Sequence, residues 1–114
     1  MPNSAEKADS AAPLPGQVAV VTGASGGIGR AIACELAAAG ADVVVHGRRS
    51  EAANATAAAV RDAGRQAQVI LADLAETHTL DDLVRQAWEW KGSVSIWINA
   101  AGVDVLTGES ADWT

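Results

Sequence analysis

Residues suited to binding an anion are concentrated in two short stretches of this sequence. Four glycines lie between positions 23 and 29, within the stretch VVTGASGGIGRAI at residues 20–32, and Arg48 and Arg49 are adjacent farther along. Glycines allow another molecule to approach a backbone closely, and the N–H groups at the start of a helix carry a partial positive charge. Arginine forms charge-assisted hydrogen bonds to phosphate. Whether the two stretches can act together depends on the elements that carry them.

Apolar runs and helical periodicities alternate along the chain. The run at residues 17–22 is typical of a strand buried on both faces of a parallel sheet. Similar runs predict strands over 41–47, 66–72 and 93–99, and helices are expected from the glycines to about residue 39, from 50 to about 63, and from 79 onward. This alternation implies parallel strands joined by right-handed crossovers, and in a doubly wound arrangement the strands would pair in the order 3-2-1-4. The predicted fold is an α/β, Rossmann-like, doubly wound parallel sheet, truncated after the fourth strand.

Apolar side chains at helical spacing predict which helix faces are buried. The first helix carries Ile28, Ile32 and Leu36 at steps of four. Ser50 and Thr79 are predicted to cap the two later helices, because hydroxyl side chains accept hydrogen bonds from the first turn. The last helix has the clearest apolar stripe, in which Trp88 is interpreted as a core residue; its members are Leu80, Leu83, Val84, Ala87 and Trp88.

Composition narrows the classes of partner. The chain has 114 residues and a formal net charge of −6, which disfavours nucleic acid and anionic membranes as partners. A single cysteine, Cys34, can form neither a disulfide framework nor a cysteine-based metal site within one chain, and it favours a cytoplasmic location. No apolar run reaches the roughly 20 residues that span a bilayer. Residues 1–15 are expected to be a disordered leader, and 16–114 one partial nucleotide-binding domain.

The glycines are expected to form a cradle for a pyrophosphate. They lie between a buried strand and an amphipathic helix, as in the first strand–helix turn of a dinucleotide-binding fold. Their spacing is Thr22-Gly23-x-x-x-Gly27-x-Gly29, and no Gly-Lys-Ser/Thr follows, which excludes a P-loop. A purely structural turn is the alternative interpretation.

This glycine stretch resembles the TGxxxGxG motif of the short-chain dehydrogenases/reductases. The resemblance implies that the glycines at 23, 27 and 29 form the phosphate turn after Thr22, and that Ser25 and Ile28 contact the cofactor from the same loop. It extends over about residues 16 to 114 and covers only the first half of a typical domain of the family.

Two further stretches are similar to motifs of the same family. Asp73 and Leu74 follow the third strand, where the family has an aspartate beside the adenine ring, and the resemblance implies that they hold the adenine end. Asn99-Ala-Ala101-Gly102 is similar to the family's N-N-A-G, with alanine in place of the second asparagine. It implies that Asn99 supports the sheet and, together with Ala101 and Gly102, lines the ribose side.

The end of the second strand predicts which dinucleotide is preferred. NAD-binding folds place an acidic residue there for the ribose 2′-hydroxyl, whereas this chain has Gly47. Arg48 follows at once and can bind a 2′-phosphate, with Arg49 as helper and Ser50 as a further contact. NADP(H) is therefore expected in preference to NAD(H), which stays open as the second cofactor. The alternative is an arginine pair that is simply solvated.

The family's reaction is hydride transfer between a nicotinamide and a carbonyl or alcohol carbon. It uses a tyrosine of a Tyr-x-x-x-Lys motif, and this sequence contains no tyrosine, so such residues are expected beyond Thr114. His46 and His78 are interpreted as ordinary structural or surface histidines, and no catalytic or metal-binding residue is assigned.

Three hypotheses follow. The first is the NADP(H)-binding portion of a short-chain dehydrogenase/reductase. The second is a nucleotide-binding module or inactive fragment without catalysis. The third is an interaction fragment that forms a homo-oligomer or pairs through an open edge of the fourth strand.

Overall fold

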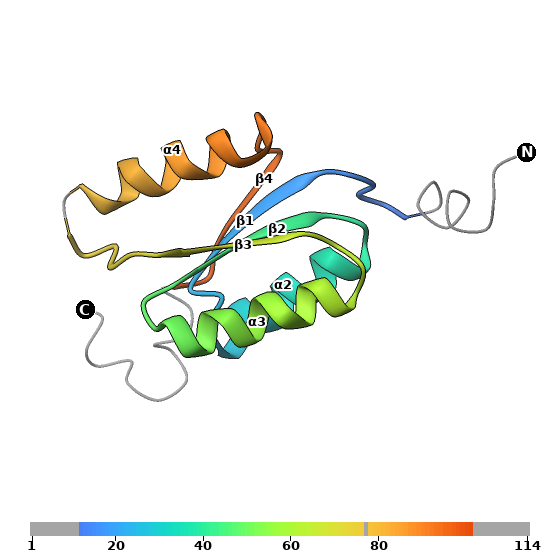
Figure 1. Ribbon diagram of the computed structural model, residues 1–114, viewed down its shortest axis with the longest axis horizontal. Helices are drawn as coiled ribbons and strands as arrows, with labels where there is room; N and C mark the ends of the chain where they lie inside the picture. Colours follow the sequence, from blue (N-terminus) through green and yellow to red (C-terminus); the bar gives the residue numbers. More distant parts are fainter. Residues whose placement is uncertain (1–11, 77, 102–114) are drawn as a thin grey trace, which may run out of the picture.

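The computed structural model describes residues 12–76 and 78–101. Four parallel strands form one sheet, with α2 and α3 on one face and α4 on the other (Figure 1). The strand order β3-β2-β1-β4 confirms the predicted α/β class and topology. The elements are β1 (Val18–Thr22), α2 (Gly27–Ala38), β2 (Asp42–Gly47), α3 (Ser50–Asp62), β3 (Ala67–Leu71), α4 (Thr79–Lys91) and β4 (Ile96–Asn99).

The segment before β1 is hydrogen-bonded to the turn between α2 and β2. Leu14 N–H donates to Ala39 O at 2.8 Å, and Gly16 N–H donates to Gly40 O at 3.0 Å. The leader expected over 1–15 therefore overlaps a segment attached to the domain, while residues 1–11 lie outside the described residues. Among the described helices, none combines the length and the apolar character needed to cross a membrane.

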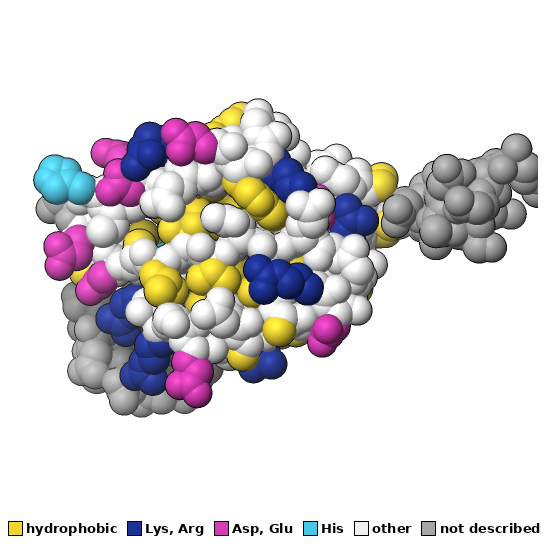
Figure 2. All heavy atoms as spheres, viewed as in Figure 1, with side chains coloured by type: hydrophobic (Ala, Val, Ile, Leu, Met, Phe, Trp, Pro, Cys, Tyr) yellow, Lys and Arg dark blue, Asp and Glu magenta, His cyan; other side chains and the backbone are white. Residues whose placement is uncertain are grey.

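The two central strands separate two apolar cores. Val43 and Val45 of β2 face the core beneath α2 and α3, whereas Val44 between them faces the core beneath α4. This alternation explains why β1 and β2 are buried along their whole length. The outer strands are only partly covered, and Figure 2 shows hydrophobic side chains exposed over β3, between α3 and α4.

α2 buries a face of small residues, one position away from the predicted stripe. Gly29, Ala33 and Ala37 are its buried residues, whereas Ile28 is 40% exposed. The large side chains of the stripe lie at the margin of the core rather than at its centre. Small side chains let the helix lie close to the sheet, which a row of large ones would prevent. The prediction from the large side chains was therefore wrong by one residue.

Only part of the stripe predicted on α4 is buried. Leu83 and Ala87 pack into the core, but Trp88 is 47% exposed, which contradicts its interpretation as a core residue. In the described part of the chain no strand lies beyond β4, so the outer side of the stripe has no sheet to cover it. The exposed members are Leu80, Val84 and Trp88.

Neither predicted hydroxyl cap is present. α3 has Arg49 at its N-cap and begins with Ser50 itself, and the N-cap of α4 is His78. The hydroxyl of Thr79 donates instead to Asp73 O at 2.6 Å and to Glu76 O at 2.9 Å. The side chain thus stabilises the turn before α4 rather than the first turn of the helix.

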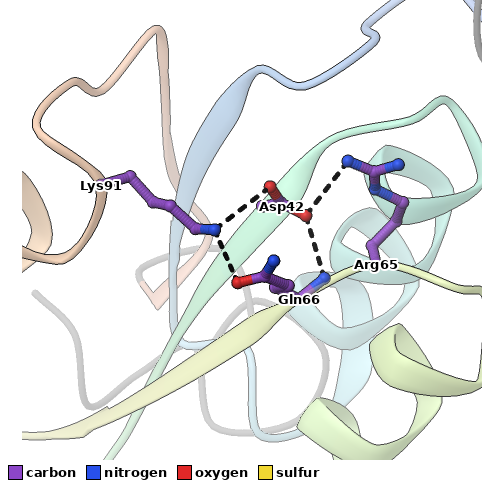
Figure 3. A network of polar contacts seen from close by, with 4 residues as sticks. All are labelled: Asp42, Arg65, Gln66 and Lys91. Carbon is purple, nitrogen blue, oxygen red and sulfur yellow. Dashed lines mark hydrogen bonds and ion pairs between the residues drawn. The ribbon is translucent and has the colours of Figure 1, made fainter.

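A polar network closes the end of the sheet where β2 begins. Asp42 is 6% exposed, and its carboxylate accepts a hydrogen bond from Gln66 N–H at 2.9 Å and pairs with Arg65 at 3.3 Å (Figure 3). Lys91, at the end of α4, approaches the same carboxylate at 3.9 Å and donates to Gln66 Oε1 at 2.6 Å. This network joins β2, the α3–β3 turn and α4 at the edge opposite the glycine loop.

Candidate functional site

The stretches singled out in the sequence meet at one edge of the sheet. Because the strands are parallel, their carboxyl ends lie together: Thr22 pairs with Asn99, and Gly47 pairs with Leu71. The glycine loop follows β1 at the middle of this edge (Figure 1). In the same strand order, Asp73 after β3 and Asn99 at the end of β4 lie on opposite sides of the loop.

The glycine loop is packed too tightly for side chains at two of its motif positions. A Cβ on Gly23 would lie 2.5 Å from the Cα of Ala101, and the φ of Gly23 is +64°. A Cβ on Gly29 would lie 2.0 Å from the carbonyl oxygen of Gly23. Contacts this short do not occur, so only glycine fits either position. The loop, the start of α2 and the segment after β4 are therefore held in direct contact.

Gly47 allows the loop to contact the end of β2. A Cβ on Gly47 would lie 3.0 Å from the Cβ of Ser25 and 3.3 Å from that of Ala53. Any larger residue, including an acidic one, would require Ser25 or its loop to move. Packing against the loop therefore disfavours a carboxylate side chain at position 47.

The side chain of Asn99 is oriented by two neighbours. Its Oδ1 accepts hydrogen bonds from the Thr22 hydroxyl at 3.3 Å and from Trp97 Nε1–H at 2.9 Å. Thr22 is 1% exposed, so its hydroxyl is directed into the structure. Thr22 therefore supports Asn99 from beneath the loop. Ala101 is exposed beside it, and Gly102 lies outside the described residues.

His46 connects the glycine loop to the end of β3. Its side chain is 3% exposed; Nδ1 accepts a hydrogen bond from Gly23 N–H at 3.0 Å, and Nε2 lies 2.8 Å from Ala72 O. A carbonyl oxygen only accepts hydrogen bonds and the Gly23 N–H only donates, so the ring must be neutral with its proton on Nε2. The backbone carbonyl of His46 also accepts from Ala24 N–H at 2.8 Å.

Burial lowers the pKa of His46 below its usual value of 6.5, and the charge of Arg48 acts in the same direction, against the hydrogen bond to Ala72. The sequence interpretation treated His46 as an ordinary structural histidine and missed this link. One signal was available: an imidazole between Val45 and Gly47 in a buried strand needs partners for both ring nitrogens.

The residues expected to contact the rest of the ligand are exposed around the loop. Arg48, Arg49 and Ser50 follow β2, and Figure 2 shows basic side chains over the start of α3. Asp73 is exposed, and its Oδ1 accepts a hydrogen bond from Ala75 N–H at 3.0 Å. Leu74 is half-buried next to it. Within residues 12–76 and 78–101, no cluster of side chains could hold a metal ion.

Together, a parallel sheet with crossover helices and a glycine turn between β1 and α2 define the nucleotide-binding class of α/β folds. The family model described as short chain dehydrogenase matches residues 17–113. The chain belongs to the short-chain dehydrogenase/reductase family, as the three sequence motifs predicted. Members of this family bind a nicotinamide dinucleotide.

Known proteins similar to the chain are oxidoreductases. It is 42% identical over 89 residues to an uncharacterized oxidoreductase of Mycobacterium tuberculosis, covering 78% of this chain and 34% of that protein. It is 39% identical over 95 residues to 3beta-hydroxysteroid dehydrogenase 1 of Eggerthella lenta, covering 82% and 36%. The chain thus spans about a third of the length of these relatives.

Solved structures of dehydrogenases have the same fold over most of this chain. A hydroxysteroid dehydrogenase from Escherichia coli superposes with a TM-score of 0.72 at 37% identity, over 75% of this chain and 37% of that one. A structure from Burkholderia cenocepacia that contains bound NADP superposes with a TM-score of 0.72 at 30% identity, over 87% and 39%.

Proposed function

We propose that this chain binds NADP(H) at the edge formed by the glycine loop, the end of β2 and the end of β4. The observation that carries the proposal is the contact of these three segments: Gly23 with Ala101, and Gly47 with Ser25. The glycines of the loop would hold the pyrophosphate at the start of α2, where backbone N–H groups favour an anion. When bound, the nicotinamide supplies hydride transfer.

The remaining motif residues would bind the outer parts of the dinucleotide. Asp73 and Leu74 lie on the β3 side of the loop and would hold the adenine. Asn99, its amide oxygen fixed by Thr22, would face the nicotinamide ribose together with Ala101. Ile28, exposed at the start of α2, would pack against the dinucleotide between these ends.

The preference for NADP(H) over NAD(H) would come from the end of β2. An acidic side chain at position 47 would require Ser25 or its loop to move, and Arg48 and Arg49 are exposed directly after Gly47. A hydrogen bond to a charged group contributes about 1.5–3 kcal/mol, which corresponds to roughly a tenfold to hundredfold difference in affinity. We assign most of this difference to Arg48, with smaller contributions from Arg49 and Ser50.

We propose that this chain is the cofactor-binding portion of an NADP(H)-dependent oxidoreductase, and that the oxidoreductase acts on a carbonyl or alcohol carbon. The sequence contains no tyrosine, so its own residues offer no Tyr-x-x-x-Lys pair for proton transfer. We therefore expect the 114-residue chain to bind the dinucleotide without turning it over. We also propose a cytoplasmic location, which the single cysteine supports because it favours a reducing compartment. Self-association through the β4 edge stays a prediction, to be tested by sedimentation at several concentrations.

The test is a pair of equilibrium titrations, with NADPH and with NADH, followed by dinucleotide fluorescence. We expect NADPH to bind more tightly, and Arg48→Ala to reduce the ratio of the two affinities by about tenfold. Arg85→Ala is the matched control, since Arg85 lies on α4 and pairs with Asp82 and Glu89. An unchanged ratio in Arg48→Ala would refute its assignment, and no binding of either dinucleotide would refute the function.

A further inference from the structure

The buried imidazole of His46 is the one side chain in the described site that joins two of its segments through both ring nitrogens. Nδ1 accepts a hydrogen bond from Gly23 N–H, the first backbone amide of the glycine loop, at 3.0 Å. Nε2–H donates to the carbonyl oxygen of Ala72, the residue directly before Asp73, at 2.8 Å. The carbonyl of His46 accepts from Ala24 N–H. Two successive loop amides are therefore fixed by one residue of β2.

This arrangement tolerates a single protonation state. A proton on Nδ1 would turn the acceptor for Gly23 N–H into a donor, and two donors would then face each other in a buried place. The hydrogen bond would break, and the charged ring would need water or a new acceptor. Because Gly23 is also in contact with Ala101 and Gly29, a displacement of Gly23 would change the shape of the whole loop.

We propose that His46 is a positioning residue that holds the glycine loop in its dinucleotide-binding shape, and that protonation of His46 releases the loop and weakens binding. This inference rests on the proposed function, because it concerns affinity for the same dinucleotide. It adds a pH-sensitive element in a residue that none of the three sequence motifs contains.

The segments that are hydrogen-bonded to His46 or paired with its strand contain few charges. Neither β1, nor the loop 23–26, nor β3 carries a titratable side chain. The charged groups beside it are Arg48, two residues farther along, and Asp73, which follows Ala72 and whose carboxylate accepts from Ala75 N–H. Burial and Arg48 both keep the ring neutral near neutral pH. Loss of affinity is therefore expected only as the pH falls below the usual histidine value of 6.5.

Two substitutions separate the two contacts of the ring. The amide of asparagine reaches about as far as Nδ1, and that of glutamine about as far as Nε2. His46→Asn can thus keep an acceptor for Gly23 N–H while losing Ala72, and His46→Gln can keep a donor for Ala72 O while losing Gly23. Neither side chain titrates. Thermal unfolding of both variants checks that they fold.

The experiment is the titration of the full chain with NADPH between about pH 8 and about pH 5. We expect wild-type affinity to fall as the pH drops through the pKa of His46, and both variants to keep only the weaker dependence that protonation of the cofactor's 2′-phosphate causes. At about pH 8, His46→Gln should bind about tenfold more weakly than wild type, and His46→Asn only two- to threefold more weakly. Equal losses in the two variants, or a pH dependence as steep in both variants as in wild type, would overturn the proposal.

A second measurement keeps this inference separate from the proposed function. Without any dinucleotide, we expect the Gly23 amide to be protected from hydrogen exchange in wild type and His46→Asn, and much less protected in His46→Gln. If wild type bound no NADPH but this pattern held, the proposed function would fail while the positioning role stood. Unchanged protection of Gly23 in His46→Gln would overturn the positioning role whatever the binding result.

Discussion

Gly29 is the position where a single added carbon should do the most damage to the glycine loop. A Cβ there would lie 2.0 Å from the carbonyl oxygen of Gly23 and 3.1 Å from the Cα of Ala24. The first contact is with backbone, so no side-chain rotation can relieve it. Since Gly29 is in the buried face of α2, the helix and the loop must move apart by more than an ångström.

The expected cost follows from this overlap. Overpacking by a methyl group destabilises a well-packed site by about 1–3 kcal/mol. We expect a cost in the upper part of this range, because the added methyl group would collide with backbone atoms, which cannot rotate away. For a domain of this size, about 2 kcal/mol corresponds to a decrease in Tm of roughly 8–16 °C. Gly26→Ala is the matched control, because a Cβ on Gly26 would meet nothing within 4 Å and its φ is −172°.

Urea unfolding of the two variants, with NADPH titration at a concentration where both are folded, tests the reasoning. Gly29→Ala should lose stability and bind NADPH at least tenfold more weakly, because its loop is displaced. Gly26→Ala should stay within about 1 kcal/mol of wild type in stability. If Gly29→Ala were as stable as Gly26→Ala and bound NADPH equally well, the tight packing of α2 on the loop would not be what shapes the site.

Three further predictions concern stability. Leu83→Ala should lower the free energy of unfolding by about 3 kcal/mol in urea titrations because Leu83 is fully buried, whereas Leu80→Ala, at an exposed position, should cost under about 1 kcal/mol. Thr56→Val should raise it by about 1 kcal/mol, because the buried Thr56 hydroxyl has no hydrogen-bond partner in the described structure; a decrease would contradict this. Burial lowers the pKa of His46 in the folded chain, so the stability that neutral His46 contributes is complete above pH 6.5 and is lost as the pH falls through the lowered pKa. Unfolding titrations at several pH values should show this loss in wild type and not in His46→Asn.

The fold followed from the sequence because its signals are local and repeated. Apolar runs at the strands and glycines after the first two helices predicted the bounds of the described elements to within about three residues, except for the end of α4, for which no bound was predicted. The errors arose where packing distance decided the outcome. The large side chains of α2 predicted that the face containing Ile28 is buried. The helix lies so close to the sheet that its buried residues are instead Gly29, Ala33 and Ala37. The exposure of Trp88 depends on how far the sheet extends, which no helical periodicity encodes.

The position of the candidate site was predictable where it depends on motifs and unpredictable where it depends on contacts across strands. The glycine spacing and the Asn99 stretch placed two segments at one edge, because parallel strands bring their ends together. The sequence did not indicate that Ser25 packs against Gly47, nor that the hydroxyl of Thr22 orients the side chain of Asn99. The link made by His46 joins residues 23 apart and 26 apart, and only the three-dimensional arrangement reveals it.

The central claim is that one edge of this sheet binds NADP(H), and backbone amide shift mapping by NMR tests it most directly. On addition of NADP⁺, the account predicts the largest changes in the glycine loop from Gly23 to Gly29, at Gly47 to Arg49, at Asp73 and Leu74, and at Asn99 to Ala101. Residues of the Asp42 network at the opposite edge should barely change. Shifts centred on that opposite edge or on the exposed face of α4, or no shifts at saturating NADP⁺, would contradict the account.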